Sequence, residues 1–130
     1  MPEPFAVLLV MGPDRLPHLM RALQPMDAEV VTAATCDEAL EVFRRDGRVR
    51  VLVTAPNLPD AAWSDLLHAA REVRPEAKVV VCSPLGDARL WIDVLEAGGF
   101  DVLAEPFVGW EVKRIVLSAA NRCAAALATG

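Results

Sequence analysis

The side chains that most often perform chemistry are few in this sequence and lie far apart. Its three cysteines, Cys36, Cys82 and Cys123, are odd in number and form no C-x-x-C pair. His18 and His68 are its two imidazoles, and no nucleophile is arranged around either. A metal site, a disulfide and a catalytic Ser-His-Asp or Cys-His site are therefore not indicated. We expect buried or half-buried thiols in a reducing cytosol, and no metal, cofactor or enzymatic activity.

The stretch Val49–Asp60, VRVLVTAPNLPD, is where a functional site would form. Its β-branched start predicts a strand buried on both faces, and Pro56 ends the pairing because it lacks a backbone donor. A turn follows, and Asp60 is positioned to cap the next helix. In open α/β sheets, ligands gather beyond the carboxyl ends of the strands. At that place this chain has Ala55 and Pro56, which cannot do chemistry.

Short apolar runs predict five strands, and helical spacings of apolar residues predict five helices, in strict alternation. The strands are expected at Phe5–Met11, Glu29–Ala33, Val49–Thr54, Lys78–Cys82 and Phe100–Ala104. The helices are expected at Arg15–Gln24, Cys36–Asp46, Ala61–Val73, Asp87–Ala97 and Gly109–Ala126. Such alternation implies a parallel sheet with helices on both faces. Five units favour a flavodoxin-like doubly wound (βα)5 three-layer sandwich, strand order 2-1-3-4-5, over the other common doubly wound order.

Two helix starts carry capping signals. Asp14 is expected to cap the first helix, and Thr35 with Glu38 fits a capping box for the second. In the box, the hydroxyl and the carboxylate each accept a hydrogen bond from an otherwise unsatisfied backbone N–H.

Length and composition predict a single domain, residues 1–130, with flexible ends at residues 1–4 and 124–130. No apolar block approaches the ~18 residues of a membrane span. The first residues lack the basic region of a signal peptide, so we expect a cytoplasmic protein. The net charge of −5, with scattered basic residues, argues against direct binding of nucleic acid.

The sequence resembles a receiver domain of the two-component response-regulator family over nearly its whole length, from Phe5 to Arg122. The resemblance rests on the unit lengths, the N-L-P-D turn at Asn57–Asp60, V-V-V-C-S at Val79–Ser83 and L-E-A-G-G-F-D-V-L-A-E-P-F at Leu95–Phe107. The family typically has an Ala-Gly pair, a fifth strand and then Lys-Pro-Phe. Its active members hold Mg²⁺ with an acidic pair after the first strand and phosphorylate an Asp that ends the third.

The functional positions of the family are mostly replaced in this chain. By position, the acidic pair falls on Met11 and Gly12, the acceptor on Ala55, the phosphate-binding hydroxyl on Ser83, the switch aromatic on Val102 and the lysine on Glu105, before Pro106. Only the hydroxyl and the proline remain, and the resemblance implies a cis bond before Pro106. A hard divalent ion needs carboxylate oxygens, so aspartyl phosphorylation at the usual place is excluded. The chain therefore looks like a degenerate, or pseudo-receiver, domain.

Asp14 and Asp60 could restore the site only by a shift in register, and helix capping explains both better. Ser83 could bind an anion, although Ser-Pro after a strand is also ordinary turn chemistry. For Glu105 two interpretations stand: a bond to Ser83 or nearby amides that locks the site, or a solvated surface carboxylate.

The tryptophans raise the question of an interface. Trp91 shares the inward helical stripe of Val94 and Leu95, which favours a core or partly buried position. The family commonly associates through helix 4, strand 5 and helix 5, and an exposed patch there would suit an interface. The candidate interface residues are Leu90, Trp91, Val102 and Trp110.

The sequence therefore predicts a signalling module that acts by protein–protein contact without Asp phosphorylation. The partner would be another protein or a second copy at the helix 4–strand 5–helix 5 face, with an output domain possible in cis and no membrane. The alternative is a regulatory domain that binds a small ligand or nucleotide in the vacated crevice. Residues 11–14, Met-Gly-Pro-Asp, match no phosphate-binding loop.

Overall fold

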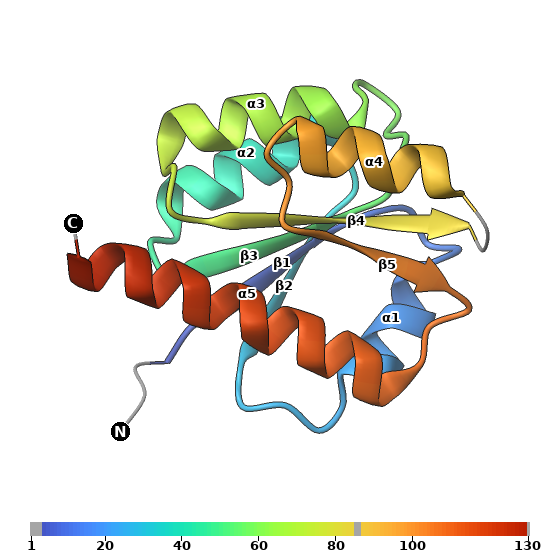
Figure 1. The fold of residues 1–130 in the computed structure, drawn as a ribbon, viewed down its shortest axis with the longest axis horizontal. Coiled ribbons are helices and arrows are strands. Elements are labelled where there is room, and N and C mark those ends of the chain that lie inside the picture. The colour runs from blue at the N-terminus through green and yellow to red at the C-terminus, as the bar shows by residue number, and fades with distance from the viewer. Residues whose placement is uncertain (1–3, 85–86, 130) are drawn as a thin grey trace.

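The computed structural model describes residues 4–84 and 87–129, which form a parallel five-stranded sheet between two layers of helices (Figure 1). The strands are β1 (Ala6–Val10), β2 (Glu29–Ala33), β3 (Val49–Thr54), β4 (Lys78–Pro84) and β5 (Asp101–Glu105). The helices are α1 (Leu16–Leu23), α2 (Cys36–Arg45), α3 (Trp63–Val73), α4 (Ala88–Glu96) and α5 (Gly109–Thr129). The strand order is β2-β1-β3-β4-β5, so the predicted flavodoxin-like fold is confirmed.

The two faces of the sheet carry separate cores because neighbouring side chains of a strand point to opposite faces. In β1, Ala6, Leu8 and Val10 belong to the core under α2, α3 and α4. Val7 and Leu9 belong to the core under α1 and α5. Figure 1 shows α2, α3 and α4 on one side of the sheet and α1 and α5 on the other. All five β1 residues are buried, as the apolar sequence run predicts.

Several element boundaries differ from those predicted. Strand β4 continues through Ser83 to Pro84, where a loop was expected, because it pairs with β5 up to Pro84 opposite Glu105. Helix α5 continues to Thr129, past the predicted end at Ala126 and through most of the expected flexible end. Residues 1–3 and 130 of the expected ends lie outside the described residues.

Of the caps predicted for α1 and α2, the cap of α2 is confirmed and the cap of α1 is wrong. The Thr35 hydroxyl accepts from the Glu38 N–H at 3.1 Å, and the Glu38 carboxylate accepts from the Ala34 N–H at 3.2 Å. Asp14 does not cap α1, whose N-cap residue is Arg15, with no side-chain cap. Helix α1 therefore begins one residue later than predicted. Pro17 fits its first turn, because a backbone N–H at that place would have no intrahelical partner.

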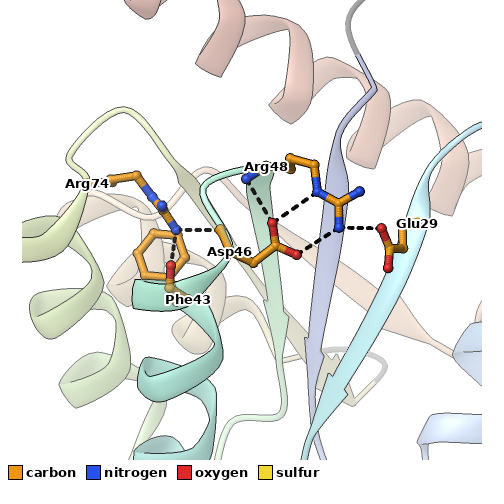
Figure 2. A network of polar contacts seen from close by, with 5 residues as sticks. All are labelled: Glu29, Phe43, Asp46, Arg48 and Arg74. Atoms are coloured by element: carbon orange, nitrogen blue, oxygen red, sulfur yellow. Dashed lines mark hydrogen bonds and ion pairs between the residues drawn. The ribbon is translucent and has the colours of Figure 1, made fainter.

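A polar network at the amino-terminal end of the sheet ties β2, α2, β3 and α3 together (Figure 2). The Arg74 guanidinium, just after α3, donates to the main-chain carbonyls of Phe43 and Asp46 at the end of α2, and it lies 4.0 Å from the Phe43 ring centre. Arg48 donates to the Asp46 carboxylate at 3.1–3.2 Å and pairs with Glu29 at 2.5 Å. The Arg74 bonds provide partners for carbonyls at the end of a helix, where the intrahelical pattern supplies none. They lie at the far edge of the sheet from the site described next.

Candidate functional site

The carboxyl ends of β1, β3, β4 and β5 bring the predicted site positions to one edge of the sheet. The Ala55 N–H donates to the Val10 carbonyl at 2.9 Å, which places Met11 and Ala55 beside each other just past their strands. Ser83 and Glu105 lie on the neighbouring strands β4 and β5, which pair in this region. The structure therefore brings these positions together at one edge of the sheet, and few of their side chains carry chemistry.

Apolar side chains occupy two of the positions to which the resemblance assigns the acidic pair and the acceptor. Met11 and Ala55 are each only 2% exposed, and they pack in one core cluster with Cys82 and half-buried Leu58. A thioether and a methyl group offer no hard oxygen ligand for a divalent ion. Among the described residues, no group of three or more His, Cys, Asp or Glu side chains could hold a metal ion.

The two buried hydroxyls of the site are used by the main chain beside them. The Ser83 hydroxyl donates to the Pro84 carbonyl at 3.0 Å, and the Thr54 hydroxyl donates to the Ala55 carbonyl at 2.9 Å. Both residues are buried. Ser83 therefore has the local turn-like bond that the sequence allowed as one of its two interpretations.

Glu105 pairs with a residue that the sequence reasoning did not consider. Its Oε1 accepts from Arg15 Nε at 2.5 Å, with the two side chains 26% and 34% exposed. The predicted lock named the wrong partner, because Glu105 binds Arg15 and not Ser83 or nearby amides. The alternative of a solvated surface carboxylate is also wrong, because the carboxylate forms an ion pair. Arg15 lies four residues past Met11, in the loop before α1. The signal in the sequence that could have indicated a nearby cation was the glutamate at position 105, where the family has a lysine. The Glu105–Pro106 bond is cis, as the resemblance implied.

The cysteines are free and buried, as predicted. Burial raises the pKa of the Cys82 thiol to about 12, with a further increase from the Glu105 charge and an opposing effect from Arg15. Burial likewise raises the pKa of Cys36 and of Cys123. A thiol must lose its proton to act as a nucleophile, so none of the three is activated.

Asp60 caps a helix, but not the helix that was predicted. Its carboxylate accepts from the Cys36 N–H at 2.8 Å and from the Asp37 N–H at 3.0 Å, both in the first turn of α2. These backbone N–H groups lower the pKa of the carboxyl. Helix α3 instead begins after Ala62, whose N–H donates to Asp65 at 3.0 Å. Asp60 therefore joins the β3–α3 loop to α2, a long-range contact that local sequence signals do not reveal.

A groove of about 1000 Å³ lies beside the filled site, between α1 and the β5–α5 loop. On the α1 side it is lined by Asp14, Arg15, His18, Arg21, Ala22 and Gln24, and on the other side by Pro84, Glu105, Pro106, Phe107 and Gly109. Sequence reasoning missed this groove, because its two walls are distant in sequence and meet only through the packing of α1 on α5.

The candidate interface residues differ in exposure. Trp91 is 48% exposed and Trp110 is 69% exposed, whereas Leu90 and Val102 are half-buried against the core. The prediction that Trp91 packs in or near the core is wrong, because α4 buries only Val94 of its predicted stripe. Exposed Ile92 and Leu95 add to the apolar surface of α4.

Solved structures of low sequence identity share this architecture. The response regulator receiver domain protein from Clostridium thermocellum is 22% identical, with a TM-score of 0.81 over 91% of this chain and 95% of that chain. A signal receiver domain from Vibrio parahaemolyticus is 19% identical, with a TM-score of 0.84 over 98% and 99%. At this identity the likeness concerns the fold.

Two curated proteins also resemble the sequence, although no family model matches it. The DNA-binding transcriptional regulator NtrC of Azospirillum brasilense is 28% identical over 118 residues, which are 89% of this chain and 24% of that protein. The chemotaxis protein CheY of Thermotoga maritima is 26% identical over 70 residues, 54% of this chain and 58% of that protein. No described helix is long and apolar enough to cross a bilayer. The fold and these relatives together support a response-regulator receiver domain.

Proposed function

We propose that this chain is a pseudo-receiver: a signalling module that regulates through protein–protein contact, without phosphorylation of an aspartate and without catalysis. The observation that carries the proposal is the burial of Met11 and Ala55 at the positions of the acidic pair and the acceptor. Phosphoryl transfer needs a carboxylate acceptor and concentrated positive charge around the phosphate. Here the acceptor position holds Ala55, whose methyl group cannot accept a phosphoryl group, and the cation Arg15 is already paired with Glu105.

The test is the response to Mg²⁺ and beryllofluoride, which together imitate a phosphorylated aspartate. We expect the melting temperature and the amide NMR spectrum to stay unchanged when both are added. A saturable, Mg²⁺-dependent shift would contradict the proposal, since another carboxylate would then have taken over the acceptor's role.

The contact surface that we propose is the α4–β5–α5 face, with Trp91 and Trp110 as its anchors. Both indoles are exposed, and tryptophan is enriched among the residues that dominate binding energy at interfaces. Its occupant would be a second copy of the chain or another protein, including an effector attached in cis. The surrounding residues carry charges of both signs, such as Arg89 and Asp93, which form an ion pair at 3.3 Å. Such a mixed polar rim is common around interface cores.

Sedimentation of the purified chain over a range of concentrations tests the homodimer version. We expect association that Trp91→Ala and Trp110→Ala each weaken, while the melting temperature stays close to that of the parent. Met20→Ala is a matched control, because Met20 is an exposed apolar residue on α1, outside this face. If the chain stays monomeric, the homodimer version is wrong and the partner at this face would be a different protein. If Met20→Ala weakened association as much as the tryptophan variants, the α4–β5–α5 face would not be the contact surface.

A further inference from the structure

The groove between α1 and the β5–α5 loop has the size and the opposed walls of a small-molecule site. Its volume of about 1000 Å³ lies at the upper end of typical ligand cavities, which span roughly 300–1,000 Å³. It is separate from the filled metal position, since neither Met11 nor Ala55 lines it. A ligand there would therefore not contact the positions of the acidic pair or the acceptor, whereas Glu105, at the position of the family's lysine, lines the groove.

One wall of the groove presents cationic and imidazole side chains at regular spacing. Arg15, His18 and Arg21 are three residues apart at the start of α1 and along it, so they lie on neighbouring positions of one helical face. His18 and Arg21 are exposed, and within the described chain their side chains make no hydrogen bond or ion pair. Guanidinium groups bind phosphate with two parallel N–H donors. This wall therefore offers donors for an anion, and the carboxylate of Asp14, which lines the same wall, opposes one.

The opposite wall is formed by the rings of Pro106 and Phe107, with Gly109 at the start of α5. Gly109 lies close to α1, and a Cβ atom there would come within 3.4 Å of the Ala22 carbonyl. This is a van der Waals distance, so the start of α5 is in contact with α1. Phe107 is half-buried, so part of its surface remains accessible beside the groove. A flat ring is the kind of ligand group that such apolar surfaces accept.

We infer that this groove binds a mononucleotide, with its phosphate toward His18 and Arg21 and its base against Pro106 and Phe107. Cations on one wall and rings on the other match the two chemical halves of such a ligand. Glu105 limits the affinity, because its carboxylate occupies Arg15 at 2.5 Å and repels a phosphate. This inference goes beyond the proposed function, and either can fail without the other.

NMR titration of the full chain with AMP, without Mg²⁺, tests the inference. We expect saturable amide shifts in α1 and at residues 107–109. Inorganic phosphate and adenosine, titrated separately, should each bind more weakly than AMP. Arg21→Gln should weaken AMP binding about tenfold, the size expected when one charge-assisted hydrogen bond is lost. Glu105→Gln should strengthen it, because the variant removes the competing charge and frees Arg15.

Arg44→Gln is the matched control, since Arg44 is an exposed arginine on α2, on the opposite face of the sheet. It should leave the AMP affinity unchanged, and the melting temperatures of all three variants establish that each is folded. Three outcomes would overturn the inference: no saturable shift at millimolar AMP, phosphate bound as tightly as AMP, or equal weakening by Arg21→Gln and Arg44→Gln. Groove shifts caused by an acidic peptide but not by AMP would overturn it in favour of a protein-docking surface.

Discussion

Arg15 Nε and Glu105 Oε1 lie 2.5 Å apart and join the start of α1 to the end of β5. In the family that the sequence resembles, the loop after the first strand is acidic and the residue before the proline is a lysine. Here the cation follows β1 and the carboxylate ends β5. The two loops are thus linked by a pair of opposite charges, whose signs are the reverse of those at the matching positions of that family. The pair therefore links the start of α1 to the end of β5 through side-chain charge.

Exchanging the two charges tests whether this pair stabilises the fold. Glu105→Lys and Arg15→Glu each place like charges together and should lower stability, whereas the double variant restores an attractive pair. We expect a coupling of about 1 kcal/mol from urea unfolding, because both side chains remain partly exposed. A coupling near zero would show that the pair contributes nothing measurable.

Restoring a carboxylate at the filled site should damage the protein. Met11→Asp places a charge among Ala55, Cys82 and Leu58, and the cation whose charge acts on this cluster, Arg15, is already paired with Glu105. We expect a loss of about 3 kcal/mol in the free energy of unfolding, as for other unpaired buried charges. Met20→Asp is the control. The Met20 side chain is 37% exposed, so the free energy of unfolding of this variant should differ little from that of the parent. Equal effects of the two variants would mean that position 11 is not the closed apolar site described above.

The fold was predictable because the apolar periodicities agree with one another along the chain. Five strand-forming runs such as Val49–Thr54 alternate with five amphipathic helices, and few topologies fit that order. The edge of the sheet that holds the site was predictable for the same reason. The contacts within it were not: Arg15 reaches Glu105 across 90 residues, and Asp60 reaches α2 across 23 or more. A capping residue looks the same in sequence whichever helix it caps.

The exposure of Trp91 was missed for a related reason. Its spacing with Val94 predicts a shared inner stripe, but α4 touches the sheet over a narrow strip that buries only Val94. The width of the buried stripe of a helix depends on the distance between the helix and the sheet, and a single sequence does not specify that distance.

The buried thiols should be inert in the folded protein. A pKa of about 12 keeps Cys82 protonated at neutral pH, and burial raises the pKa of Cys36 and Cys123 as well. At pH 8 a thiol-reactive disulfide reagent should modify none of the three quickly in the native chain and all three in denaturant. Rapid modification of one thiol under native conditions would identify a local opening that the structure does not show.

Asp60 should make the stability of the protein dependent on pH in the acid range. The N–H groups of Cys36 and Asp37 lower its pKa in the folded state below the unfolded value of about 3.9. A carboxyl shifted in this direction contributes its stability above the unfolded pKa and loses it as the pH falls through the lower, folded pKa. Asp60→Asn should therefore be less stable than the parent at neutral pH, and the difference should shrink below about pH 4.

Urea unfolding between pH 2 and pH 7 measures this difference, with Asp14→Asn as the control. Asp14 is an exposed aspartate whose side chain makes no hydrogen bond within the described chain, so its variant should follow the parent across the whole range. If Asp60→Asn also ran parallel to the parent down to acid pH, the carboxylate would not be capping α2 in solution. The β3–α3 loop would then be held to α2 by the packing of Leu58 and Ala61 against the core rather than by charge.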